Sequence, residues 1–170
     1  ARISHTRWQL QTTSISTAPL ERFESILAPD DNDHYGAYFS MPGGVFLVIL
    51  SQKSGSAVAD AYLSQGGKRP ESKRELVQEA VAEISNVVVN TVAATLADAC
   101  DMVFFLSAPE MTYGKKEYIM MEAPKKFKSS GENFTIMTYV HMSSPSLSSD
   151  CTVVILLNSR WRDRLLQALG

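Results

Sequence analysis

Residues 72–100 read SKRELVQEAVAEISNVVVNTVAATLADAC, and this stretch decides the fold because it predicts one long helix. Ser72 and Glu75 have the Ser-x-x-Glu spacing of a capping box, which satisfies backbone N–H groups at a helix start. A stripe suited to packing then follows at steps of four and three residues. Its members are Val77, Val81, Ile84, Val88, Val92, Thr95 and Ala99. At ~1.5 Å per residue, the helix is roughly 40 Å long.

A second stripe of four polar residues lies on the opposite face of this helix: Glu79, Glu83, Asn86 and Asn90. At ~100° per residue they fall within a sector of roughly 60°, so their side chains project together. The plain explanation is the solvated face of an amphipathic helix. However, asparagine is a poor helix former, and each one at mid-helix costs about a few tenths of a kcal/mol. Two glutamates four residues apart also repel each other mildly. The stripe is therefore a candidate site.

A β-hairpin is the clearest unit outside the long helix. Tyr35–Met41 and Val45–Ser51 are rich in apolar and β-branched residues, and Pro42-Gly43-Gly44 joins them as a turn. Weaker patterns predict further strands at Trp8–Ile15, Met102–Leu106, Lys115–Met121, Phe134–Met142 and Cys151–Leu157. Helices are expected at Ser56–Ser64, which Gly66-Gly67 ends, and at Leu165–Leu169.

A weak internal repeat runs through this order of elements. The segment Val45–Lys53 aligns with Thr152–Arg160 at an offset of 107 residues, and a helix is expected after each. The chain therefore predicts an α+β fold of two similar strand, hairpin and helix halves. Its mainly antiparallel sheet packs against the long helix, in a single domain spanning 1–170. The first half lacks a long helix before Trp8, which we expect to have been lost in evolution or to lie upstream of residue 1.

Composition limits the partners and the compartment. The chain has 170 residues, of which 45% are hydrophobic, and a net charge of −2. These values fit one globular domain and argue against disorder, a nucleic-acid partner or an anionic membrane. The longest apolar runs, Val45–Leu50 and Val153–Leu157, fall far short of the ~20 residues that span a bilayer. Cys100 and Cys151 show neither zinc spacing nor a disulfide framework, so we expect a cytoplasmic protein.

Other chemistries find little support in the sequence. His5, His34 and His141 stand alone, without a second metal ligand at helical or strand spacing, and we expect surface or strand-end positions for them. The sequence has no G-x-S-x-G elbow for a Ser/His/Asp hydrolase and no Gly-rich phosphate loop. The basic and aromatic stretch at 113–128 could favour single-stranded nucleic acid, but a solvated hairpin explains it more simply.

The polar stripe carries a resemblance to a known family. Glu83-Ile84-Ser85-Asn86, followed after 22 residues by Pro109, resembles the Glu-x-x-Asn-x22-Pro signature of the CheC/CheX/FliY family of chemotaxis response-regulator phosphatases. The resemblance covers roughly residues 45–170. It implies an α+β fold of two similar halves, with long helices lying against a mainly antiparallel sheet. We expect the proline to follow a strand.

The resemblance also implies a reaction and roles for the residues. The substrate would be the aspartyl phosphate of a CheY-like response regulator, which brings its own Mg²⁺, so the phosphatase needs no cofactor of its own. Asn86 would orient the attacking water. Glu83 would accept a hydrogen bond from the regulator's invariant lysine. The family usually has Asp or Ser at the place of Glu79 and a small residue at the place of Asn90, and we expect these two to contact the partner.

Three functions stay open at this level. The first is a phosphatase in chemotaxis or two-component signalling. With its single motif the chain resembles CheX more than CheC, so a homodimer and a CheD-like deamidase partner are both plausible. The second is a non-catalytic docking or adaptor module for a receiver, a flagellar-switch protein or a deamidase-like partner. The third is a structural piece of a larger protein.

Overall fold

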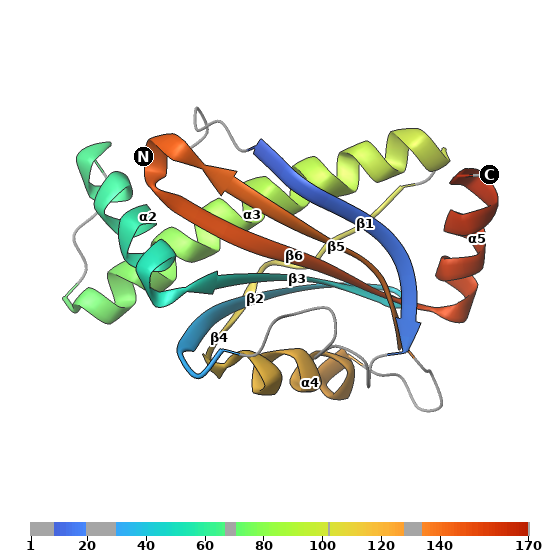
Figure 1. Cartoon of the computed structure of the whole chain (residues 1–170), viewed down its shortest axis with the longest axis horizontal. Coiled ribbons are helices and arrows are strands. Elements are labelled where there is room, and N and C mark those ends of the chain that lie inside the picture. The colour runs from blue at the N-terminus through green and yellow to red at the C-terminus, as the bar shows by residue number, and fades with distance from the viewer. Residues whose placement is uncertain (1–8, 20–29, 67–70, 102, 128–133, 170) are drawn as a thin grey trace.

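The computed structural model describes residues 9–19, 30–66, 71–101, 103–127 and 134–169. Its centre is a twisted antiparallel sheet of six strands in the order β1-β5-β6-β3-β2-β4 (Figure 1). The strands are β1 (Gln9–Pro19), β2 (Asp33–Met41), β3 (Gly44–Ser51), β4 (Glu110–Lys115), β5 (Phe134–Ser144) and β6 (Ser149–Asn158). The helices are α2 (Gln52–Ser64), α3 (Lys73–Cys100), α4 (Lys116–Phe127) and α5 (Ser159–Leu169), with a 3₁₀ turn η3 (Pro145–Leu147). The predicted α+β class is confirmed.

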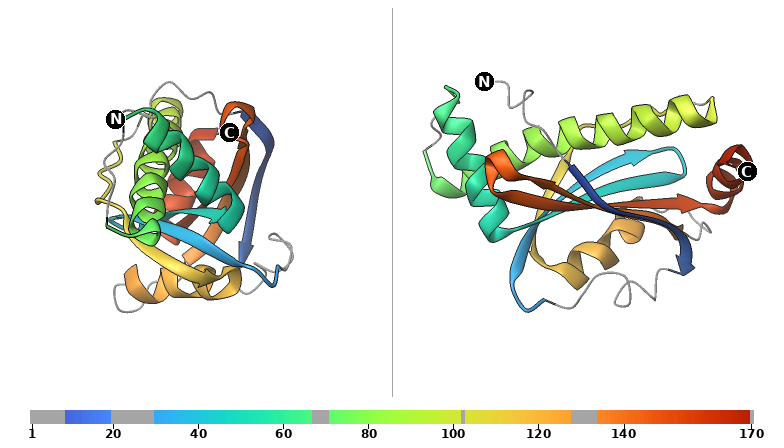
Figure 2. Two further views of the ribbon diagram at one scale, coloured as in Figure 1. Left: turned by 90° about the vertical axis from the view of Figure 1, so that its left-hand side faces the viewer. Right: turned by 45° about the horizontal axis from the view of Figure 1, so that its top comes forward.

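Helices cover both faces of this sheet. The end-on view in Figure 2 shows α4 on the side opposite α3 and α2. Because strand side chains alternate between faces, β3 divides its apolar residues between two clusters. Phe46 and Val48 belong to the cluster beneath α2, α3 and α5, whereas Leu47 joins Ile119 and Met120 of α4. The two central strands are buried on both faces, which explains their nearly continuous apolar sequence.

The long helix α3 confirms the strongest prediction. Its N-cap is Ser72, whose hydroxyl oxygen accepts a hydrogen bond from the Glu75 N–H at 3.2 Å. It runs for 28 residues and ends at Asp101, which adopts the left-handed conformation. Among the described helices, the stretch Lys73–Asp98 is long and apolar enough to cross a membrane, with a mean hydropathy of 1.4. Its buried side chains explain that composition, since they pack in the main core: Leu76, Val77, Ala80, Val81, Ile84, Val88, Val89 and Ala93.

The hairpin and three further strands are also confirmed. In the hairpin, Met41 pairs with Gly44, and Gly43 between them has a φ of +78°, where glycine is favoured. The strands β1, β5 and β6 correspond to the segments expected at Trp8–Ile15, Phe134–Met142 and Cys151–Leu157. Trp8 itself lies outside the described residues.

The sheet supports the predicted duplication. Leu47 of β3 pairs with Val154 of β6, and these two residues are also equivalent in the repeat of 107 residues. A pseudo-two-fold axis therefore passes between them. Outward from this pair, β2 corresponds to β5 and β4 to β1. The helix caps correspond too, since Ser51 accepts a hydrogen bond from the Ser54 N–H at 3.1 Å and Asn158 from the Trp161 N–H at 3.0 Å.

Two predicted strands are wrong. Residues 103–109, which include most of the expected strand Met102–Leu106, form no ladder, and Met102 lies outside the described residues. The segment expected as the strand Lys115–Met121 is the last residue of β4 followed by helix α4. Its apolar run is too short to reveal a period, and the second face of the sheet selects the helix. The basic stretch is accordingly β4 and a helix instead of a hairpin.

Two predicted helices begin earlier than expected. Helix α2 begins at Gln52 instead of Ser56, and α5 begins at Ser159 instead of Leu165. The pattern treated Gly55 as a breaker, but it lies buried inside α2 against the ring of Tyr35. Trp161 lies in the first turn of α5 and packs against Phe104, with ring centroids 5.6 Å apart.

Candidate functional site

The four polar residues of the predicted stripe lie on the face of α3 that points away from the core. Glu79, Asn86 and Asn90 are exposed, and Glu83 is half-buried. Val81, Ile84 and Val88, on the opposite side of the same turns, are buried in the main core. Because one packed helix carries all four groups, their backbone separations are fixed. The predicted common face is therefore present.

A direct contact joins two of these residues. The Nδ2 of Asn90 donates hydrogen bonds to the backbone oxygen of Asn86 at 2.7 Å and to its Oδ1 at 2.9 Å. Sequence spacing places the two residues one turn apart, but it does not specify the rotamers that bring their amides together. This contact is a feature of the site that sequence reasoning missed.

The segment after α3 returns along the molecule toward β4, as Figure 1 shows. From Glu83 to Asp101 the helix rises about 27 Å, and an extended chain from Asp101 to Pro109 covers about 26 Å. Pro109 thus comes back to about the level of the Glu83 turn. It directly precedes β4, which corrects the expectation that it follows a strand. The 22-residue spacing therefore corresponds to one helix half and its extended return.

The return segment is anchored on the sheet and presents apolar groups to solvent. The Ser107 N–H donates to the Ser40 carbonyl at 2.9 Å, and the Ser40 N–H donates to the Ser107 hydroxyl at 3.0 Å. Phe104 packs inward on Phe46 at 6.1 Å between ring centroids. Val103 and Phe105 alternate with it and are 66% and 77% exposed. The wrong strand prediction at Met102–Leu106 concealed this exposed pair.

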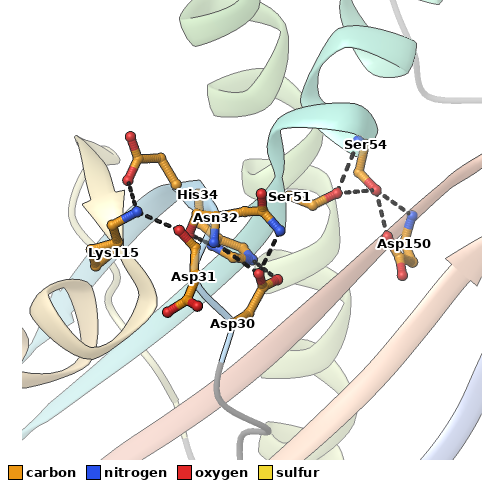
Figure 3. Close-up of polar contacts among 9 residues, drawn as sticks. Asp30, Asp31, Asn32, His34, Ser51, Ser54, Lys115 and Asp150 are labelled. Atoms are coloured by element: carbon orange, nitrogen blue, oxygen red, sulfur yellow. Dashed lines mark hydrogen bonds and ion pairs between the residues drawn. The ribbon is translucent and has the colours of Figure 1, made fainter.

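A second polar cluster competes as a candidate site and is shown in Figure 3. The Ser54 hydroxyl donates to a carboxylate oxygen of Asp150, and the Ser51 hydroxyl donates to that of Ser54 at 3.1 Å. The Asp150 N–H also donates to the Ser54 hydroxyl, at 3.2 Å. These bonds fasten the first turn of α2 to β6. The cluster is thus a helix cap tied to the sheet.

His34 belongs to a separate group beside this cluster. It is 4% exposed at the start of β2, and its Nε2 lies 3.3 Å from a carboxylate oxygen of Asp30. Two hydrogen bonds from Asn32, at 2.9 Å from N and 2.6 Å from Nδ2, lower the pKa of Asp30. The strand-end prediction for His34 holds, but the residue is buried. His5 lies outside the described residues, and the side chain of His141 does too.

Metal and serine-hydrolase chemistry find no grouping of side chains in the part of the chain that the structure describes. No three residues among His, Cys, Asp and Glu gather there as a metal site would require. The hydrogen-bonded serine of Figure 3 faces a carboxylate, whereas His34 pairs with Asp30. A serine nucleophile needs a histidine base within hydrogen-bond reach.

The fold and the helix face define the class to which the chain is similar: it has the α+β fold shared by the CheC, CheX, FliY and FliM proteins. FliY of Thermotoga maritima matches over 96% of this chain and 81% of its own, with a TM-score of 0.60 and 13% identity. CheX of Desulfovibrio desulfuricans matches over 91% and 88%, with a TM-score of 0.53 and 13% identity.

A third similar structure is FliM of H. pylori in a FliM–SpeE complex. It matches over 97% of this chain and 80% of its own, with a TM-score of 0.59 and 14% identity. No protein-family profile matches the sequence, and no curated protein matches it either. The likeness is therefore one of fold, and the roles of the four polar residues remain predictions.

Proposed function

We propose that the chain is a cytoplasmic phosphatase that hydrolyses the aspartyl phosphate of a CheY-like response regulator in chemotaxis or a related two-component pathway. The observation that carries the proposal is the outward placement of Glu83 and Asn86 on one packed helix, within a fold that CheX and FliY share. A helix face that stands clear of the core suits a macromolecular substrate better than a small one, which would need an enclosing cavity.

The reaction asks little of the phosphatase beyond positioning. The oxygen of a water molecule forms a bond to phosphorus, and the bond from phosphorus to the aspartyl carboxyl oxygen breaks, with its electron pair returning to the carboxylate. The water proton leaves to solvent or to the phosphate product. Mg²⁺ held by the regulator balances charge on the phosphoryl oxygens. Asn86 supplies an exposed amide that holds the water in line with the breaking bond.

Glu83 serves docking in this scheme. A carboxylate one helical turn from Asn86 can accept a charge-assisted hydrogen bond from a lysine of the regulator. Its half-buried position restricts the side chain, which lowers the entropy lost when the partner binds. Glu79 and Asn90 flank the pair on the same face, where we expect them to contact the partner. A homodimer and a CheD-like deamidase partner remain predictions.

The test is the rate of phosphate loss from a phosphorylated CheY-type regulator, with and without this protein. Acceleration should fall at least about a hundredfold in Asn86→Ala, as for loss of a positioned catalytic group. Binding of a regulator carrying a stable phosphoryl mimic should persist in that variant. Glu83→Ala should weaken binding instead. Thr95→Ala changes an exposed residue of the same helix outside the stripe and serves as the matched control.

A docking module without hydrolysis is the second candidate. It is favoured by the similarity to FliM, which was crystallised with a protein partner, SpeE. In that case the chain would bind a receiver or flagellar-switch protein through the same helix face, and the phosphate would disappear at its spontaneous rate. Binding without acceleration in the assay above would replace the phosphatase with this adaptor.

A further inference from the structure

We propose that Asn90 is a positioning residue that holds the side-chain amide of Asn86 in one of its two orientations, with the NH₂ group turned outward. The consequence for catalysis rests on the proposed phosphatase function. The orientation itself rests only on the hydrogen bonds of α3.

The first step of the argument concerns Asn90. Its terminal amide lies 2.7 Å from the backbone oxygen of Asn86. A backbone carbonyl oxygen can only accept hydrogen bonds, so the group that faces it must be the NH₂ of Asn90. The reverse orientation would place two oxygens against each other at that distance. The helix backbone therefore fixes which way the Asn90 amide points.

The second step transfers this orientation to Asn86. The same Nδ2 of Asn90 lies 2.9 Å from the end of the Asn86 side chain. Since the nitrogen is already a donor, it must meet an acceptor, which is Oδ1 of Asn86. The Nδ2 of Asn86 then points away from Asn90. An amide that could otherwise flip between two orientations is held in one by a contact within the helix.

This orientation determines what Asn86 offers to a docked partner. Two N–H donors face outward, where they can contact a phosphoryl oxygen or the attacking water. Oδ1 uses one lone pair for Asn90 and keeps the second for a hydrogen of the water. Without Asn90, the exposed amide would exchange between this arrangement and its reverse. Preorganisation of a group that acts on a water molecule raises the rate rather than the affinity.

Asn90 as a partner contact and Asn90 as a positioning residue predict different kinetics. Loss of a contact to the docked regulator would raise KM at constant kcat. Loss of the amide lock should lower kcat at nearly constant KM. The small residue that the family usually has at this place could not form the lock, so the inference belongs to this chain.

The experiment compares Asn90→Leu, which keeps the size of the side chain but has no donor, with Asn90→Ala. Both should lower kcat about two- to tenfold at saturating phosphorylated regulator, with KM changed less than about twofold. Thr91→Ala is the matched control, because its exposed hydroxyl also donates to a carbonyl four residues back, that of Val87 at 2.8 Å, without touching Asn86. An unchanged kcat, or a change in KM alone, would overturn the proposal.

A spectroscopic readout keeps this test independent of the phosphatase assignment. In ¹⁵N-labelled protein, the side-chain NH₂ signals of Asn86 and Asn90 should be separate and sharp. In Asn90→Leu, the Asn86 signal should shift and lose its single orientation, whereas Thr91→Ala should leave it in place. If the wild-type chain accelerates no hydrolysis, the proposed function fails, and these signals still decide about the lock. An Asn86 signal unaffected by Asn90→Leu would refute it.

Discussion

At the scale of single residues, Cys151 shows how burial determines reactivity. Its side chain is 3% exposed in β6, and burial, aided by the charge of Asp150, raises the pKa of the thiol to about 12. The thiolate is the reactive form, so native protein should resist a maleimide at pH 8. The measurement is mass spectrometry of a Cys100→Ser variant, before and after unfolding in urea. Labelling of the folded variant as fast as the unfolded one would contradict this expectation.

The same thiol predicts the sign of a pH effect on stability. Above its ordinary pKa of 9.0, the unfolded chain loses the Cys151 proton while the folded chain keeps it. Stability from this residue is therefore complete below pH 9 and falls as the pH rises toward 12. Urea unfolding at pH 8 and 10 should show a smaller loss of stability in Cys151→Ala than in the parent chain. An equal loss in both proteins would contradict the assignment.

At the scale of elements, the long helix was predictable because its signals are local. The cap at Ser72 and the regular apolar steps lie within the helix itself, and so does the shared polar face. By contrast, the run Tyr118–Met121 fits a strand as well as a helix, and only the buried face of β3 decides for the helix. The Asn86–Asn90 bond depends on side-chain rotamers, which spacing leaves open.

The cap of α3 provides a direct test at this scale. Ser72→Ala removes the acceptor of the Glu75 N–H and should lower the free energy of unfolding by about 1 kcal/mol. Ser72→Asp, which can accept the same hydrogen bond, should retain most of the stability and serves as the control. Chemical unfolding monitored by circular dichroism gives both values. Equal losses in the two variants would show that the hydroxyl does not act as a cap.

Helix α2 tests a close approach between elements. A Cβ on Gly55 would lie 2.8 and 2.9 Å from two ring carbons of Tyr35 and 3.2 Å from a methyl group of Val77. Alanine normally stabilises a helix by about 1 kcal/mol over glycine, but overpacking costs about 1–3 kcal/mol. Because Tyr35 also packs against the ring of Tyr113, at 4.9 Å between centroids, it cannot easily move. Gly55→Ala should therefore destabilise the protein on balance.

A second substitution distinguishes crowding from other effects of the added methyl group. In a Tyr35→Leu background the ring is absent, and Gly55→Ala should cost less or become stabilising. The two free energies of unfolding, with and without the ring, form a double-mutant cycle. If Gly55→Ala stabilised the parent chain, the close packing of α2 on β2 would be refuted.

At the scale of the whole molecule, each half of the sheet completes the other. Strand β1 comes from the first half but pairs with β5 of the second, and β4 comes from the second half but pairs with β2 of the first. The hairpins meet at the central pair β3 and β6. Helix α3 packs against α2 and β2 of one half and against α5. The proposed site thus lies on a helix that the whole fold holds in place.

This exchange of edge strands predicts that neither half folds alone. Cutting the chain between α2 and α3 would leave the hairpin β2–β3 with two open edges, from which β4 and β6 have been removed. Phe46 and Val48, which are fully buried, would also lose their neighbours on β6 and α3. Open strand edges and exposed apolar faces are not stable in so small a sheet. Fragments 1–66 and 67–170, produced separately, should each lack cooperative unfolding.

Mixing the two fragments supplies the complementary half of the prediction. The exchanged strands should drive association, and the complex should recover the circular dichroism and the cooperative unfolding of the intact chain, with a midpoint that depends on concentration. Leu47→Asp in the first fragment places a charge at the pseudo-two-fold axis, where the side chain is fully buried, and should abolish recovery. Independent folding of either fragment would mean that the halves are separable units, and the exchanged edge strands would then not bind them together.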